Sequence, residues 1–126
     1  MLVLDSGGVS VLARRSPASL ALLAVLRREG LWPALVPSTV LVECLTGHPG
    51  KDAVTNRFLK TCDIAEFVPQ ALARRAAALR AQARRGSAVD ALVVAAAEPG
   101  GMVLTSDTGD LGALAENATG VAIQRA

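Results

Sequence analysis

The sequence has few of the side chains on which many catalytic and structural sites depend. Its 126 residues include two cysteines, one histidine and three aromatic residues, and tyrosine is absent. Cys44 and Cys62 are isolated, without a CxxC pair or a neighbouring histidine, so neither a zinc site nor a disulfide framework is indicated. His48 is the only histidine, so the sequence gives little indication of a histidine-based triad or a His-rich metal site.

Long apolar runs are also missing. The longest, such as residues 20–26, are far below the roughly 20 residues that a membrane helix needs. The N-terminus lacks the basic segment of a signal peptide. We therefore expect a soluble, cytoplasmic protein. The length and the 52% of hydrophobic residues predict a single domain spanning residues 1–126.

Short apolar runs alternate with helical patterns along the chain. Strands are expected at 1–4, 31–36, 64–68, 102–105 and 121–124. Helices are expected at 9–15, 17–29, 38–47, 51–61, 70–85, 88–98 and 107–117. Strands separated by helices, with no hairpin signal, predict an α/β fold: a three-layer sandwich with a central, mostly parallel sheet of about five strands.

Five carboxylates occupy positions from which this fold can bring them together, namely Asp5, Glu43, Asp90, Asp107 and Asp110. Asp5 and Asp107 directly follow expected strands, and the carboxyl ends of parallel strands lie at one edge of a sheet. Asp107 and Asp110 are about one helical turn apart. We predict that the five acids share a pocket at that edge.

Each acid also has a simpler interpretation. Asp5 could initiate a turn with Ser6-Gly7-Gly8, and Asp90 could form a capping box with Ser87. Asp107 could be a helix N-cap. Glu43 lies beside an apolar stripe, which predicts a partly buried position at the edge of the core, although a solvent-facing glutamate fits equally well. Only their joint placement favours a site.

Clustered carboxylates repel one another unless a cation lies between them. Hard oxygen ligands without histidine or cysteine favour Mg²⁺ or Mn²⁺ over Zn²⁺. Apart from these five acids the chain has six Asp and Glu against 13 Lys and Arg, so the remaining surface is basic. A basic surface around an acidic metal centre fits a polyanion such as RNA, although a solvated surface is the simpler explanation.

The expected helix at 70–85 has one apolar stripe, formed by Leu72, Ala76, Leu79 and Ala83, and arginines on its other faces. Arg80, Arg84 and Arg85 lead toward Asp90 and could guide a phosphate backbone to the metal. A solvated helix face is the alternative. Scarce aromatic residues leave little scope for base stacking, so recognition of RNA shape and backbone is expected.

Four segments resemble the ordered motifs of PIN domains and together cover essentially the whole chain. They are Val3-Leu4-Asp5-Ser6, Val36-Pro37-Ser38-Thr39-Val40-Leu41-Val42-Glu43, Val89-Asp90-Ala91-Leu92-Val93-Val94-Ala95-Ala96-Ala97 and Val103-Leu104-Thr105-Ser106-Asp107-Thr108-Gly109-Asp110-Leu111. The chain departs from the family pattern at Gly7-Gly8, where the first helix usually begins with apolar residues.

The compact form is similar to the VapC-type toxins of bacterial toxin–antitoxin pairs. The resemblance implies an endoribonuclease that depends on Mg²⁺ or Mn²⁺, a VapB-like antitoxin as partner and a homodimer. It further implies that the catalytic quartet is Asp5, Glu43, Asp90 and Asp107, that these four acids and the nearby Asp110 bind the metal, and that Ser6 and Thr105 support the site.

Two other functions remain open. A phosphotransfer domain would also have an acid after its first strand, but Gly7 stands where a haloacid-dehalogenase-like enzyme needs its second Asp, and Lys51 and Lys60 are the only lysines available to a receiver. A catalytically weak module that acts through its antitoxin or another partner is the stronger alternative, because the same acids predict both functions.

Overall fold

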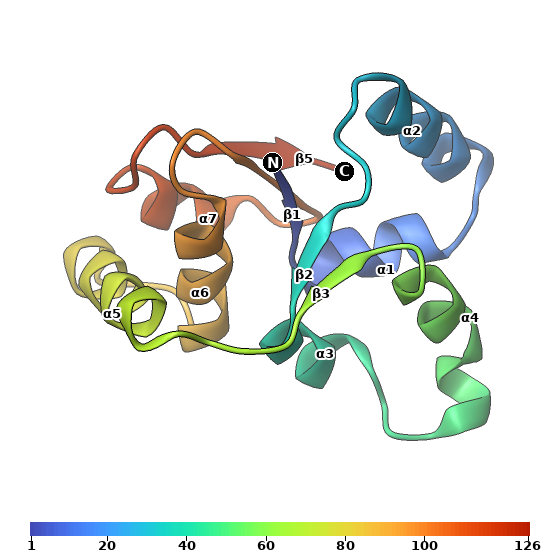
Figure 1. The fold of residues 1–126 in the computed structure, drawn as a ribbon, viewed down its shortest axis with the longest axis horizontal. Helices are drawn as coiled ribbons and strands as arrows, with labels where there is room; N and C mark the ends of the chain where they lie inside the picture. Colours follow the sequence, from blue (N-terminus) through green and yellow to red (C-terminus); the bar gives the residue numbers. More distant parts are fainter.

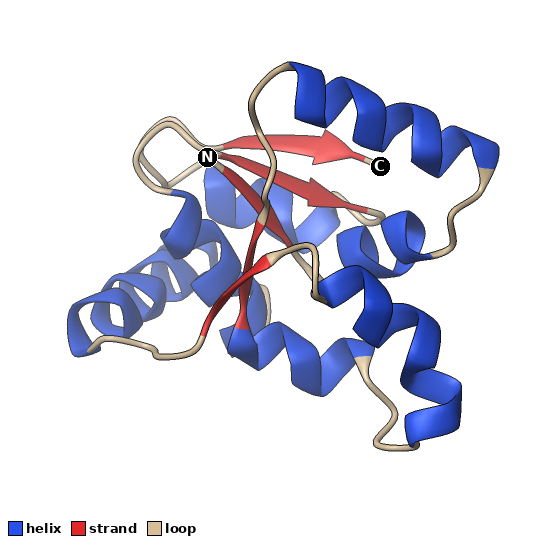
Figure 2. Ribbon diagram, turned by 45° about the vertical axis from the view of Figure 1, so that its right-hand side comes forward, coloured by secondary structure: helices blue, strands red, loops and turns tan.

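A parallel five-stranded sheet forms the centre of the molecule (Figures 1 and 2). The computed structural model describes residues 1–126. The strands are β1 (Leu2–Leu4), β2 (Leu35–Pro37), β3 (Asp63–Ala65), β4 (Met102–Thr105) and β5 (Ala122–Arg125). Their order across the sheet is β3-β2-β1-β4-β5, and all four neighbouring pairs are parallel. The predicted three-layer α/β fold is confirmed.

Helices cover both faces of the sheet (Figure 1). One group consists of α1 (Ser6–Ala13), α2 (Pro17–Arg28), α3 (Ser38–Cys44) and α4 (Pro49–Leu59), and the other of α5 (Gln70–Ala83), α6 (Ala88–Ala97) and α7 (Gly109–Ala115). Within each group the helices contact one another. None of them is by itself long and apolar enough to cross a membrane; α1 and α2 would pass that test only together, and they are bent by 112° at the break between them.

The central strands are the most deeply buried part of the chain. In β1, Leu2, Val3 and Leu4 are at most 1% exposed, because α1 and α6 lie on opposite faces of the sheet. Val3 pairs with Leu35 on one side and with Val103 on the other. A strand buried on both faces has to be apolar throughout, which explains the short continuous apolar run at the N-terminus.

Two strands are shorter than predicted. The run at 31–36 becomes extended only from Leu35, and the run at 64–68 ends at Ala65. Leu35 pairs with Val3, the second residue of β1, so β1 extends only one residue beyond this pair on the side before Leu35, and Pro33 has no N–H to donate. On the other side, Pro37 pairs with Ala65 just where β2 ends. The lengths of the neighbouring strands set both limits.

The prediction for Asp5 to Gly8 is wrong. These residues were expected to form a turn before a helix at 9–15, but α1 already begins at Ser6. The Asp5 side chain accepts the Gly8 N–H at 2.7 Å and so caps the helix, which lets the two glycines form its first turn. The remaining helices begin or end within a few residues of the predicted positions.

An ion pair joins the helices of the second group to the loop after α7. Arg75 in α5 donates from Nε and Nη2 to the two carboxylate oxygens of Glu98, both at 2.8 Å. Glu98 also accepts the Thr119 N–H at 2.7 Å. The guanidinium of Arg75 is the main cause that lowers the pKa of Glu98 to about 2.

This lowered pKa predicts a loss of stability in acid. Because the pKa of Glu98 is lower in the folded chain than its ordinary value of 4.5, its contribution is present above pH 4.5 and is lost as the pH falls from there to about 2. We expect the unfolding free energy of Glu98→Gln, measured by urea titration between pH 2 and pH 7, to depend less on pH than that of the wild type. Equal slopes for the two proteins would contradict this expectation.

Candidate functional site

Four of the five predicted acids line one polar pocket, with a volume of about 200 Å³. It lies at the carboxyl ends of β1 and β4, where the chain order changes direction in the sheet, the position at which open α/β sheets form their binding crevice. The other lining residues come from the start of α1, the end of β4, the segment that follows β4 and α7. The full lining is Asp5, Ser6, Gly7, Asp90, Thr105, Ser106, Asp107, Asp110 and Leu111.

Asp5 is the most enclosed of these acids. It is 9% exposed, and each of its oxygens accepts one hydrogen bond, Oδ1 from the Gly8 N–H and Oδ2 from the Thr105 hydroxyl at 2.6 Å. Burial raises the pKa of Asp5 above its ordinary value, and the nearby charge of Asp90 raises it further. The two hydrogen bonds act in the opposite direction. An ionised Asp5 therefore favours a nearby cation.

The two glycines of α1 permit the close contact between this helix and β4. A Cβ added at Gly8 would lie 2.3 Å from the carbonyl oxygen of Leu104, and one at Gly7 would lie 2.3 Å from Ser106 Oγ. Both separations are far inside van der Waals contact. Glycine at these positions thus lets Asp5 reach the hydroxyl of Thr105 on the neighbouring strand.

Thr105, predicted as a supporting residue, connects two of the acids. Its fully buried hydroxyl donates to Asp5 Oδ2 and accepts the Asp107 N–H at 3.1 Å. We expect Thr105→Val, which keeps the shape, to lower the unfolding free energy by about 1–3 kcal/mol, because a charge-assisted hydrogen bond is lost inside the protein. The pKa of Asp5 should also rise, since the hydroxyl lowers it. NMR titration of Asp5 checks this, and an unchanged pKa would contradict it.

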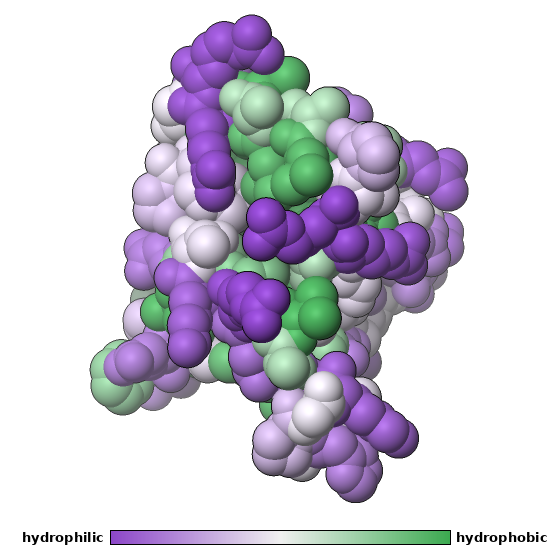
Figure 3. Space-filling view, turned by 90° about the vertical axis from the view of Figure 1, so that its right-hand side faces the viewer, coloured by the Kyte–Doolittle hydropathy of each residue, from purple (hydrophilic) through white to green (hydrophobic).

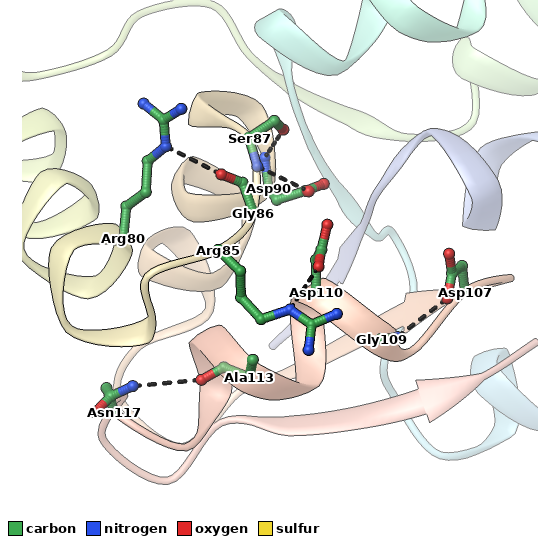
Figure 4. A network of polar contacts seen from close by, with 10 residues as sticks. All are labelled: Arg80, Arg85, Gly86, Ser87, Asp90, Asp107, Gly109, Asp110, Ala113 and Asn117. Carbon is green, nitrogen blue, oxygen red and sulfur yellow. Dashed lines mark hydrogen bonds and ion pairs between the residues drawn. The ribbon is translucent and has the colours of Figure 1, made fainter.

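In Asp90 and in Asp107, one oxygen of the side-chain carboxylate accepts a hydrogen bond from a backbone N–H group (Figure 4). Asp90 forms the predicted capping box: its Oδ2 accepts the Ser87 N–H at 3.1 Å, and Ser87 Oγ accepts the Asp90 N–H at 3.0 Å. Asp107 is not the N-cap of α7; Thr108 has that position, and Asp107 Oδ1 accepts the Gly109 N–H at 3.0 Å. The second oxygen of each carboxylate accepts no hydrogen bond from the protein.

Glu43 is outside the pocket lining but within its electrostatic field. Its side chain is exposed and accepts no hydrogen bond, so of the two positions that the sequence left open, the solvent-facing one is found and the partly buried one is not. Desolvation raises the pKa of Glu43, and the charges of Asp90 and Asp5 raise it further.

Asp52 in α4 holds the loop after α3 by accepting the N–H groups of Thr46 and Gly47, both at 2.9 Å.

The three predicted RNA-binding arginines have different surroundings (Figure 4). Arg80 donates from Nε to the Gly86 carbonyl at 3.0 Å, and Arg85 donates from Nε to Asp110 Oδ1 at 2.7 Å. Arg84 is exposed, has a positive φ of 56° and makes no side-chain hydrogen bond. Of the three, Arg85 alone contacts a residue that lines the pocket.

The carboxylates fit a divalent cation by their chemistry. They supply hard oxygen atoms only, and Asp5 and Glu43 have pKa values raised in part by the charge of Asp90. The side chains do not form a preassembled cage of three or more metal ligands. Binding would therefore need rotation of side chains, for which Glu43 and the free oxygens of Asp90 and Asp107 are available.

Three residues of the pocket lining, Gly7, Ser106 and Leu111, were not predicted from the sequence as part of a site. Ser106 lies between Thr105 and Asp107 in a segment that had been singled out, so its position could have indicated a role. Gly7 was regarded as part of a turn, and only its separation from Ser106 in the fold reveals the close packing. Outside the pocket, no sequence pattern indicated that Asp52 would hold the loop after α3.

A second cavity lies between α1, α2 and α4, with a volume of about 210 Å³. Apolar side chains form most of its lining, and Arg15, Arg27 and Arg57 lie around them. Figure 3 shows this face, where apolar side chains are flanked by hydrophilic ones. We call it the arginine-flanked groove.

No family model matches the chain, and no curated protein matches it significantly. The geometry of the acidic pocket and its surroundings is therefore the basis on which a function can be assigned.

Proposed function

We propose that the chain is a divalent-metal-dependent endoribonuclease of the VapC-like, PIN-domain kind. One observation supports this most directly: Asp5, Asp90, Asp107 and Asp110, from three separate segments, line a single small pocket, and Glu43 lies within its field. No histidine or cysteine lies in the lining. An all-oxygen acidic pocket fits Mg²⁺ or Mn²⁺ and reactions of phosphates.

Under this proposal Asp5, Glu43, Asp90 and Asp107 hold the metal. When bound, the ion supplies a water of lowered pKa and stabilises negative charge on the phosphate. The protein fixes its ligands through neutral donors: the Thr105 hydroxyl on Asp5, the Ser87 N–H on Asp90 and the Gly109 N–H on Asp107. Each of these donors orients its carboxylate, and the Ser87 and Gly109 N–H groups leave one oxygen of Asp90 and one of Asp107 free to turn toward the metal. Ser6 lines the pocket beside them.

RNA is the proposed substrate because the residues that lead to the pocket are basic. Arg84 and Arg85 belong to the segment between α5 and α6, which ends at the capping box of Asp90, and Arg80 is bonded to the same segment. Arginine binds phosphate well, with up to two donors at a time. With three aromatic residues in the chain, contacts to backbone and shape are expected to dominate over base stacking.

A VapB-like antitoxin in the cytoplasm is the proposed partner, and the arginine-flanked groove is a suitable surface for part of it. Its lining includes Leu23 and Phe58 and three arginines but no acid, which fits an amphipathic helix with acidic residues along its edges. Arg57→Glu should then weaken capture of the antitoxin, measured by calorimetry, and leave RNA cleavage unchanged. Unaltered affinity would contradict this assignment.

The proposed homodimer has a candidate surface at Val42 and Phe67, which are 83% and 81% exposed. They lie in neighbouring segments, because Ser38, one turn before Val42 in α3, donates to the carbonyl of Glu66, the residue before Phe67, at 3.3 Å. An interface between two copies would cover both of these apolar side chains. Light scattering of the wild type and of Phe67→Asp tests the proposal, and a monomeric wild type would contradict it.

The nuclease proposal is tested by titrating the purified, partner-free chain with Mn²⁺ and Mg²⁺. We expect thermal stabilisation that saturates with metal concentration, worth about 2.7 kcal/mol at 100 times the Kd, and cleavage of RNA that EDTA stops. A protein that acts only as a binding module would show neither effect, so that result would favour the alternative function.

A further inference from the structure

Arg85 and Asp110 form the only ion pair at the acidic pocket (Figure 4). Asp5, Asp90 and Asp107 are held by backbone N–H groups or a hydroxyl, whereas Asp110 accepts a hydrogen bond from a guanidinium. The side chains of Arg85 and Asp110 are 56% and 48% exposed. Exposed pairs of this kind add little to stability, so stability alone does not account for the contact.

The backbone that presents Arg85 is fixed on both sides. Before it, the Arg84 N–H bonds to the Arg80 carbonyl and ends α5. After it, the Gly86 carbonyl accepts from Arg80 Nε, and Gly86 lies so close to α7 that an added Cβ would be 2.8 Å from Leu114 Cδ1. The segment is thereby anchored against the helix that contains Asp110, and Arg85 extends from it toward the pocket.

Arg85 uses only Nε for Asp110, which leaves both terminal nitrogens free of protein hydrogen bonds. One of them lies on the side of the pocket that contains Asp107: a Cβ built at Gly109 would be 3.8 Å from Arg85 Nη2 and 3.4 Å from Asp107 Oδ1. A phosphate oxygen bound near Asp107 would therefore face a guanidinium that has two free donors and a permanent charge.

We propose that Arg85 binds the reacting phosphate of the substrate through its terminal nitrogens, and that Asp110 is a positioning residue for Arg85 and not a metal ligand. This inference rests on the nuclease function proposed above. It changes the role of Asp110, which had been assigned to the metal. The paired charges of Arg85 and Asp110 cancel, so the acids left to bind the metal are Asp5, Glu43, Asp90 and Asp107.

The test compares Arg85→Ala, Arg85→Lys and Asp110→Asn with the wild type in kcat, in KM and in Mn²⁺ affinity by calorimetry. For Arg85→Ala we expect kcat to fall about 100-fold with a smaller change in KM, because the contact strengthens as charge develops on the phosphate. Lysine should restore part of the loss, since it keeps the charge but not the paired donors.

Asp110→Asn should lower kcat by about 3- to 10-fold and have no further effect in an Arg85→Ala background, because the two residues act as a unit. The Mn²⁺ affinity of all these variants should stay within about twofold of the wild type, as expected for residues that do not bind the metal. Arg74→Ala is the matched control: it removes an exposed charge from α5, and Arg74 makes no side-chain hydrogen bond.

Three outcomes would overturn the inference. Arg85→Ala with a wild-type kcat would exclude contact with the reacting phosphate while leaving the nuclease function intact. Asp110→Asn with strongly weakened Mn²⁺ binding would make Asp110 a metal ligand. A wild type that binds Mn²⁺ but cleaves no RNA would refute the proposed function, and the role of Arg85 with it.

Discussion

Asp90→Asn is expected to lower kcat for RNA cleavage at least about 1,000-fold, which corresponds to about 4 kcal/mol of transition-state stabilisation. Asp90 offers the pocket one free carboxylate oxygen, and its charge adds to the effect of desolvation in raising the pKa of both Asp5 and Glu43. An amide is a neutral and poorer ligand for a hard cation. Multiple-turnover assays with saturating Mn²⁺ measure the effect, and calorimetry should show weaker Mn²⁺ binding.

The fold should survive this substitution. The amide oxygen of asparagine can still accept the Ser87 N–H, so the capping box keeps its geometry. Asp90→Asn also relieves repulsion between carboxylates. The pKa values of Asp5 and Glu43 are raised in the folded chain, so folding favours the protonated form of each side chain. The contribution of each side chain to the stability is therefore present below its ordinary pKa, 3.8 for Asp5 and 4.5 for Glu43, and is lost as the pH rises through the raised pKa.

Without metal, Asp90→Asn should therefore be at least as stable as the wild type at pH 7, by thermal unfolding. Asp63→Asn is the matched control, because Asp63 is exposed at the start of β3, at the opposite edge of the sheet, and should leave kcat unchanged. Undiminished metal-dependent cleavage by Asp90→Asn would refute the proposed metal site.

Gly8→Ala is expected to lower the unfolding free energy by about 3 kcal/mol. The added methyl group would lie 2.3 Å from the carbonyl oxygen of Leu104 and 3.1 Å from its carbon, and both atoms belong to the backbone of a fully buried residue of β4. Such a neighbour cannot rotate away, so α1 has to move from β4. That movement would separate Asp5 from Thr105, and cleavage should fall together with stability.

Gly112→Ala is the control for this substitution. Gly112 is in α7, no atom lies within 4 Å of an added Cβ, and alanine is the better helix former, so the variant should be as stable as the wild type or slightly more stable. Urea unfolding of both variants measures the difference. Equal stabilities for Gly8→Ala and Gly112→Ala would show that α1 is not packed tightly against β4.

Helices and strands that are determined by residues close together in the chain were predictable from the sequence. Ser16-Pro17 marked the start of α2, and the continuous apolar run at 102–105 marked a buried strand. The ends of β2 and β3 were not predictable, because each strand ends where its neighbour offers no further partner. The helical start of α1 was missed for a related reason: glycines normally indicate a turn, and here the Asp5 cap and the contact with β4 hold them in a helix.

The candidate site divides in the same way. The alternation of strands and helices determined that Asp5 and Asp107 would lie at one edge of the sheet, since parallel strands have their carboxyl ends on the same side. The exposed position of Glu43, the Thr105 hydroxyl between two acids and the pairing of Arg85 with Asp110 depended on tertiary structure.

By itself the sequence therefore determined the fold class and which acids could meet, because apolar periodicity and chain order suffice to place whole elements in parallel layers. Only the tertiary structure decided how each carboxylate is held and what charge it faces. Hydrogen bonds such as that between Thr105 and Asp5, 100 positions apart in the chain, depend on ångström-scale distances between elements, which are fixed by packing.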